Sequence, residues 1–312
     1  MTIQEFINEA ASHIRTYLDR NGDTDVTIEI KEVTKINDNV QHGFCLLREG
    51  QDAGVNVYLD DFYERHAAGE PMTMLMTEIE VLCGHVLKLP LPPVDCMTDL
   101  GLDNIRSKLT LRLIDAKKNE KFIADRPYID AGNGFALTAD INSKESILSK
   151  WTLSVTEDVL GSIGCSDEEL LTAAMENTLR LEPPCLTEML SVLANGTSRN
   201  FLEASALDES DFTGPLMLTN NSQWKGAAAL FYPNIQETLS ELLHGSYYAL
   251  PISIHEMLIF PEWQAPNADA LCEMLYQGNR SGLVLAGDVL SDRVLYYKAS
   301  AKKLLVVNPE AA

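Results

Sequence analysis

The chain has 312 residues, which is enough to bury a sizeable core in one large or two modest domains. A hydrophobic fraction of 46% and a charged fraction of 22% are typical of globular proteins and argue against a disordered chain. The 46 acidic residues against 24 basic ones give a net charge of −22, which opposes general binding to nucleic acid or to anionic lipid.

The N-terminal residues and the cysteines bear on cellular location. Glu5 and Glu9 stand where a secretory signal would carry basic residues, and no apolar run approaches the roughly 18–20 residues of a membrane span. The six cysteines are scattered and show no Cys-x-x-Cys spacing. In a chain of this length, such cysteines are typically reduced thiols. The sequence therefore predicts a cytoplasmic protein that does not associate with a membrane.

The N-terminal segment predicts a helix followed by an antiparallel meander. Thr2 and Glu5 form a capping box, and the apolar residues that follow recur at helical spacing until the turn at residues 21–22. The spacing of apolar residues then changes from 3.6 to 2, as expected for half-buried strands. The three strands are predicted at residues 26–31, 40–48 and 55–59.

Two helices follow the meander and lead to a predicted boundary. They are expected at residues 61–68 and from Pro71 onward. The proline-rich segment at residues 89–93 cannot continue a helix, so it is the main boundary signal, and a helix over 95–106 either closes the first unit or leads to the second. The two predicted units, with their packing into one globule left open, are residues 1–107 and 108–312.

The C-terminal part mixes helices and strands without strict alternation, which favours an α+β fold over regular βαβ units. Polar caps such as Ser166 with Glu169 mark the helix starts. Helices are expected over residues 167–180, over 186–194, from Asn234 to Gly245 and from Asn267 to about Tyr276. Strands are expected near residues 134–140, 150–155, 214–219, 226–232, 246–249, 252–260, 292–298 and 303–308.

The basic residues concentrate in one segment, 106–126, which raises the question of an anion-binding face. Acidic residues interleave with them. In addition, the alternation of residues 108–113 predicts a half-buried strand whose outer positions, Lys108 and Arg112, point into solvent. We therefore interpret the segment as a solvated surface and expect no nucleic-acid binding.

Familiar signatures of catalysis are missing from the sequence. It contains no glycine-rich nucleotide loop, no His-Glu-x-x-His zinc motif, no Gly-x-Ser-x-Gly elbow and no EF-hand spacing. The pairs Glu241 with His244 and Cys83 with His85 each lack the further ligands that a metal centre needs. We therefore expect neither a cofactor nor a metal.

The segment at residues 250–256 is the best candidate for a site, because it places Ser253, His255 and Glu256 together. On a strand, Ser253 and His255 would share a face at about 6–7 Å, too far for a hydrogen bond. On a helix, Ser253 and Glu256 would share a face and His255 would turn away. No local relay forms in either case, so His255 is either a structural histidine, which we favour, or part of a site completed from elsewhere.

The chain resembles an uncharacterised bacterial family built on a domain of unknown function. The segments that carry the resemblance are residues 57–63 with Gly69, 177–178, 218–220 with 226–228, and 248–256. A Pro-Ser-Ser-Ile-His-Glu pattern is usual in that family, and Ile252 here replaces its first serine, which weakens any proposal of a paired-serine site. The resemblance implies no activity, substrate or cofactor.

Two classes of function remain. The favoured hypothesis is a non-catalytic accessory module that presents its acidic surface to a protein partner. The alternative is a hydrolase whose site is built around His255 with Ser253 and Glu256, and with Tyr248 or Asn220 approaching from neighbouring elements.

Overall fold

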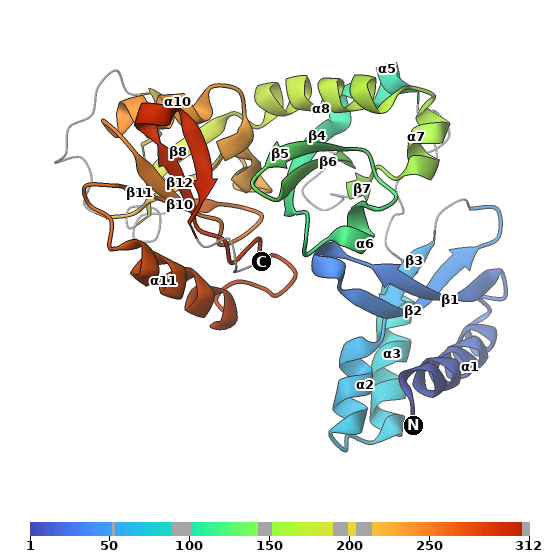
Figure 1. The fold of residues 1–312 in the computed structure, drawn as a ribbon. Helices are drawn as coiled ribbons and strands as arrows, with labels where there is room; N and C mark the ends of the chain where they lie inside the picture. The colour runs from blue at the N-terminus through green and yellow to red at the C-terminus, as the bar shows by residue number, and fades with distance from the viewer. Residues whose placement is uncertain (52–53, 89–100, 143–151, 190–198, 204–213, 308–312) are drawn as a thin grey trace. The chain divides into compact units, whose positions relative to one another are not determined.

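The computed structural model describes residues 1–51, 54–88, 101–142, 152–189, 199–203 and 214–307. These residues form two compact units, one up to Lys88 and one from Gly101 onward. Both combine helices with antiparallel sheets (Figure 1), so the predicted α+β class is confirmed. These compact units divide the described chain between Lys88 and Gly101, and the predicted division into domains of residues 1–107 and 108–312 stays a prediction.

Unit 1 has the predicted helix, meander and helices. Thr2 Oγ1 accepts the Glu5 N–H at 3.2 Å, and the Glu5 carboxylate accepts the Thr2 N–H at 2.7 Å, which completes the capping box. Gly22 ends this helix with a φ of 82°, a conformation that favours glycine. The elements are α1 (Ile3–Asn21), β1 (Val26–Thr34), a 3₁₀ turn (Ile36–Asp38), β2 (Val40–Arg48), β3 (Val55–Tyr58), α2 (Asp60–Ala67) and α3 (Met72–Val86).

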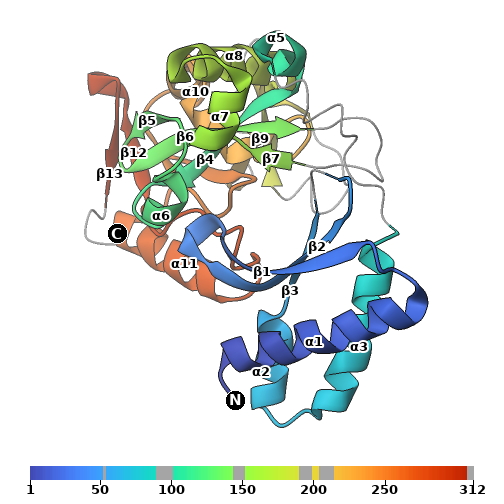
Figure 2. The same cartoon turned by 90° about the vertical axis from the view of Figure 1, so that its right-hand side faces the viewer.

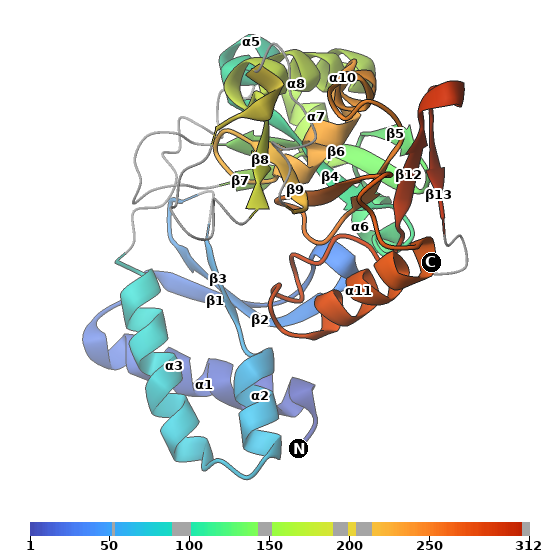
Figure 3. The same cartoon turned by 90° about the vertical axis from the view of Figure 1, so that its left-hand side faces the viewer.

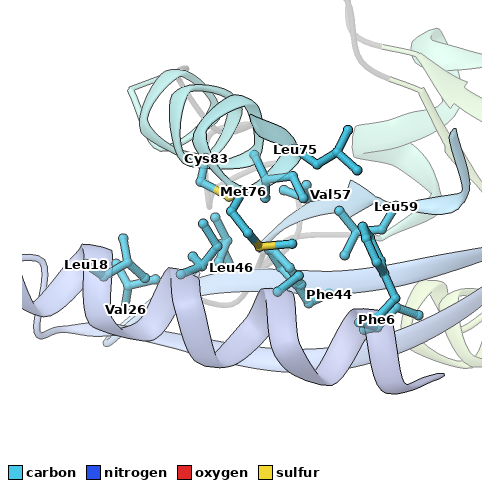
Figure 4. Packing of buried hydrophobic residues seen from close by; sticks show 14 residues of the cluster. Phe6, Leu18, Val26, Phe44, Leu46, Val57, Leu59, Leu75, Met76 and Cys83 are labelled. Carbon is cyan, nitrogen blue, oxygen red and sulfur yellow. The ribbon is translucent and has the colours of Figure 1, made fainter. Parts of the chain in front are cut away.

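The three strands pair in the order β1-β2-β3, and the helices pack against one face of the sheet. Phe44 lies opposite Ile30 in one ladder and Val57 in the other, so it stands at the centre of the sheet. Its ring packs into a core with Phe6 of α1 and Leu75 of α3 (Figure 4). Unit 1 therefore has a hydrophobic core of its own.

A four-stranded sheet opens unit 2, in the order β4-β6-β5 with β7 paired to β6. Helix α8 packs against it (Figure 2). The Asn177 side chain of this helix donates to the Leu109 carbonyl at 2.6 Å. The helix begins at the predicted capping box of Ser166 with Glu169. The elements are α5 (Leu102–Ile105), a 3₁₀ turn (Arg106–Lys108), β4 (Leu109–Asp115), α6 (Glu120–Ile123), β5 (Tyr128–Gly132), β6 (Phe135–Asn142), β7 (Thr152–Ser154), α7 (Glu157–Ile163) and α8 (Asp167–Leu181).

A six-stranded antiparallel sheet makes up the rest of unit 2, in the order β13-β12-β10-β11-β9-β8. Helix α11 packs Leu271 and Leu275 against Leu250 and Phe260 of this sheet. The elements are β8 (Pro184–Glu188), a 3₁₀ turn (Phe201–Glu203), β9 (Leu216–Asn220), the 3₁₀ helix η5 (Gly226–Phe231), α10 (Ile235–Leu242), β10 (Tyr247–Leu250), β11 (Met257–Pro261), α11 (Ala268–Arg280), β12 (Leu295–Lys298), a 3₁₀ turn (Ala299–Ala301) and β13 (Lys303–Val306). Within the described ranges, no helix is both long and apolar enough to cross a membrane.

Three predictions of secondary structure in unit 2 were wrong. The segment 226–232 is the 3₁₀ helix η5 rather than a strand, because its small side chains are buried on all sides and show no period. Residues 186–188 are in strand β8, where Leu186 pairs with Leu218, rather than in a helix; the rest of the predicted helix 186–194 lies almost entirely outside the described residues. Of the strand predicted at 252–260, only the part from Met257 onward is extended. The helix predicted over 95–106 falls largely outside the described residues.

Strand β4 also differs from its prediction as a half-buried strand. All seven of its residues are buried, because α8 packs on one side and η5 on the other. The alternation of apolar and polar residues therefore marks two kinds of buried environment rather than an inside and an outside.

Candidate functional site

The three candidate residues lie in a tight turn, residues 251–256, that joins β10 to β11. The turn is neither helical nor extended, apart from an isolated bridge between Ser253 and Val289. The N–H of Ile254 donates to the Asp288 carbonyl at 2.8 Å, and the Ile254 carbonyl accepts the N–H of Ala227 at 3.3 Å. The turn is therefore tied to two segments that are far from it in sequence.

Ser253 and Glu256 are brought together by this turn. The Ser253 hydroxyl donates to Glu256 Oε1 at 2.7 Å and accepts the backbone N–H groups of His255 at 3.0 Å and Glu256 at 3.3 Å. Only 2% of Ser253 is exposed. The hydroxyl thus satisfies two amides of the turn, which is how serine commonly stabilises such a loop.

His255 faces away from Ser253. Its Nδ1 accepts the backbone N–H of Lys225 at 3.1 Å, so the proton of the neutral ring is assigned to Nε2. Nε2 lies 3.7 Å from a carboxylate oxygen of Asp288, and the ring packs on Trp224 with centroids 4.7 Å apart. The contacts given for the His255 ring are therefore to Lys225, Asp288 and Trp224, and Ser253 reaches only the backbone N–H of His255.

Gly226 allows the neighbouring chain to approach this turn. A Cβ at this position would lie 2.7 Å from the carbonyl oxygen of His255 and 2.5 Å from the backbone nitrogen of Asn220, closer than real Cβ contacts. The same His255 carbonyl accepts the Thr219 hydroxyl at 2.8 Å. Glycine is required here because β9, η5 and the turn pack backbone to backbone.

A buried charge cluster that the sequence did not predict lies next to the turn. Asp140, which is fully buried, accepts a hydrogen bond from Lys225 Nζ at 2.6 Å, and Arg112 Nη2 lies 2.5 Å from the same oxygen. Its other carboxylate oxygen accepts the Ser154 hydroxyl at 2.8 Å. The placement of Arg112 in solvent was wrong, because η5 covers its side of β4 and Asp140 supplies its counter-charge.

Burial acts on two of the three charged groups in this cluster, Asp140 and Lys225. Burial alone would raise the pKa of Asp140, but Arg112 and Lys225 outweigh it and hold the pKa below the usual value for aspartate. Burial lowers the pKa of Lys225 to about 8, although Asp140 opposes the change. Lys225 also adopts a left-handed backbone with a φ of 56°, which is uncommon outside glycine and asparagine. At neutral pH the cluster is a closed ion-pair network.

A second buried ion pair links the same two sheets. Arg293 Nη2 lies 2.6 Å from one oxygen of Asp115, and the Ser291 hydroxyl donates to the other oxygen at 2.6 Å. Asp115 belongs to the four-stranded sheet, whereas Ser291 and Arg293 precede β12 of the six-stranded sheet. Both clusters therefore act as polar cross-links in the interior of unit 2.

The chemistry that this region can support is limited. Among the described residues, no three His, Cys, Asp or Glu side chains gather as a metal site. Two cavities in the described part of unit 2 lie along α8, and neither is lined by Ser253, His255 or Glu256. The geometry is that of a turn held in place by hydrogen bonds from its own side chains.

The sequence profile of a family of unknown function, DUF5688, matches residues 3–299. The chain therefore belongs to this family, which covers nearly its whole length. No curated protein and no solved structure matches the chain.

Proposed function

We propose that this protein is a non-catalytic accessory module that binds a protein partner. The proposal rests on one observation: the polar atoms of Ser253, His255 and Glu256 form hydrogen bonds that hold the turn and the neighbouring segment together. Residues that perform catalysis must instead present a reactive atom to a substrate.

Three exposed apolar side chains lie on the segments that are tied to this turn, and we propose that they form one surface, which we call the Trp224 surface. It consists of Trp224, Leu283 and Leu285, which are 56%, 88% and 74% exposed. Trp224 packs on the His255 ring, while Leu285 lies in a tight turn in which its carbonyl accepts the Asp288 N–H at 2.8 Å. Exposed tryptophan and leucine on a rigid base are typical of interfaces.

Charge indicates what kind of partner would fit. The whole chain carries a net charge of −22, and the Asp288 carboxylate lies 3.7 Å from the His255 ring on which Trp224 packs. We expect a protein partner that presents apolar side chains flanked by lysine or arginine. The same charge opposes binding of nucleic acid.

We place the protein in the bacterial cytoplasm as part of this proposal. The five cysteines within the described residues are free thiols, as expected in a reducing compartment. The bacterial origin rests on the family resemblance of segments such as residues 248–256.

A hydrolase is the second candidate, and one observation favours it. The hydrogen bond of 2.7 Å between Ser253 and Glu256 joins a hydroxyl to a carboxylate that could act as its base. Against it, Ser253 is almost fully buried and its hydroxyl already accepts two backbone amides. A substrate would have to open the turn to reach it.

Affinity capture from the source cell's lysate tests the proposed surface. We expect the wild-type protein to retain a partner at least about tenfold better than a Trp224→Ser, Leu285→Ser variant, since truncation of an interface anchor commonly costs more than 1.4 kcal/mol. Trp263→Ser is the matched control, because it removes another exposed tryptophan of unit 2. If no protein is retained, or if the double variant retains the same protein equally well, the proposal is wrong.

A further inference from the structure

Strand β13 forms one edge of the six-stranded sheet in unit 2. Among the described residues it pairs with β12 alone, and it lies at the outer side of the unit (Figure 3). The N–H of Val307 donates to the Val294 carbonyl at 2.9 Å, so the alternation of an antiparallel ladder directs the backbone of residues 303 and 305 to β12 as well. The N–H and C=O groups of Leu304 and Val306 therefore point to the open edge, where another strand can pair with them.

Three lysines stand where the chain turns from β12 into β13. Lys298, Lys302 and Lys303 are exposed, and in the part of the chain that the structure describes none of them forms an ion pair. Lys298 and Lys303 lie directly opposite each other in the ladder, so their side chains share one face of the sheet. Like charges in this position repel each other, and an anion beside them would reduce the repulsion.

The nearby carboxylates are engaged elsewhere or face the other side of the sheet. Glu262 accepts the Tyr296 hydroxyl at 2.7 Å, so it lies on the face that also carries the two opposed lysines, but it forms an ion pair with neither. Glu237 and Glu241 lie near Tyr297, whose side chain points to the opposite face. Two lysines without a counter-charge therefore stand beside a single glutamate that is hydrogen-bonded to a tyrosine.

The register of β13 determines what an added strand would place beside it. Every pair of strands in this sheet is antiparallel, so we take the added strand as antiparallel too. A residue opposite Leu305 is then followed two positions later by a residue opposite Lys303, on the same face. Both lie at non-hydrogen-bonded positions, where the Cα atoms are about 4.5 Å apart and the side chains are closest. The residue between them lies opposite Leu304 and exchanges backbone hydrogen bonds with it.

We propose that β13 binds an extended segment of a partner protein as an added strand, with an apolar side chain at the half-buried Leu305 and a carboxylate at Lys303. In such complexes the backbone hydrogen bonds provide affinity and alternate side chains provide specificity. A second copy of this chain suits the edge less well, because it brings the same lysines and the same net charge of −22. This inference rests on the proposed function, since it requires a protein partner, but it concerns a surface other than the Trp224 surface.

A selection from a phage-displayed library of random peptides tests the inference. The bait is the full chain with Trp224→Ser and Leu285→Ser, so that peptides that need the Trp224 surface are not enriched. We expect the enriched peptides to share an apolar residue followed two positions later by aspartate or glutamate. No enrichment, or enrichment of peptides without this order, would overturn the proposed strand addition, whereas the Trp224 surface is judged by the affinity capture alone.

A double-mutant cycle on an enriched peptide then locates the charge contact. By fluorescence polarisation, Lys303→Gln and the replacement of the peptide's acidic residue by its amide should each weaken binding roughly five- to tenfold, but together little more than either alone. Lys88→Gln is the matched control, because it changes an exposed lysine of unit 1, and it should change the affinity less than about twofold. Additive effects would contradict a contact between the carboxylate and Lys303.

The backbone contact is tested on the peptide, which leaves the fold of the protein unchanged. N-methylation of the residue between the apolar and the acidic position removes the N–H that would donate to Leu304, and it should weaken binding at least about tenfold. N-methylation of the acidic residue, whose amide points away from β13, is the matched control. Equal effects of the two methyl groups would contradict an added strand at β13.

The lysines of an edge strand can also serve to prevent pairing with other strands. In that case Lys303→Gln would strengthen peptide binding rather than weaken it, and the variant would self-associate in sedimentation velocity experiments. We expect the variant to stay in the same oligomeric state as the wild type. Tighter peptide binding together with self-association would overturn the proposal.

Discussion

Replacing Asp140 by alanine is expected to destabilise unit 2 by about 3–5 kcal/mol, because the change leaves Arg112 and Lys225 buried without their shared counter-charge. The measurement is native-state amide hydrogen exchange of peptides from unit 2, which reports the free energy of opening. Asp130→Ala is the matched control, since this exposed aspartate of β5 accepts only a local hydrogen bond from the Gly132 amide. Its effect should stay below about 1 kcal/mol.

A triple variant distinguishes the effect of leaving charges without a counter-charge from the effect of losing packing at this site. Arg112→Met, Asp140→Leu and Lys225→Met together remove every charge of the cluster and keep its volume apolar. We expect much of the lost stability to return, because a buried ion pair can be replaced by packed apolar side chains at little cost. An Asp140→Ala protein as stable as the wild type would contradict the ion-pair network itself.

Replacing Phe44 by alanine is expected to destabilise unit 1 by about 3–5 kcal/mol, the usual cost of truncating a buried phenylalanine. Phe44 stands at the centre of the sheet and fills the core against α1 and α3. Hydrogen exchange should show faster opening of unit 1 and unchanged exchange in unit 2, as expected if the units fold independently.

The neighbouring strand offers a matched control for Phe44. Ile30 is its partner in the ladder and is 46% exposed, so Ile30→Ala should cost less than about 1 kcal/mol. If Phe44→Ala accelerated exchange equally in both units, the two would unfold together, which would contradict the selective effect expected here.

The elements that the sequence predicted well are those specified by neighbouring residues. The capping boxes at Thr2 and Ser166 and the period of two in the meander act over a few positions, and the structure contains them. The segment η5 escaped prediction because its small buried residues carry neither a period nor a cap. The elements that pack on the two sides of a segment cannot be predicted from the sequence of that segment.

The candidate site was predicted in part. The residues of the turn stand out in the sequence, but the pairing of Ser253 with Glu256 requires a turn that is neither a strand nor a helix. The Asp140–Lys225 pair joins residues 85 positions apart. A long-range contact between single charges leaves no pattern in one sequence, and Arg112 on an alternating strand was misleading for the same reason.

The central claim, that the turn at residues 251–256 is a structural brace, is tested most directly by the free energy of unfolding of Ser253→Ala. The account predicts a loss of about 1–3 kcal/mol in unit 2, because two partly buried amides and the Glu256 carboxylate lose their partner. Replacing a catalytic serine commonly leaves stability unchanged or raises it, since active sites sacrifice stability for function. A Ser253→Ala protein as stable as the wild type, or more stable, would contradict the structural account and favour the hydrolase.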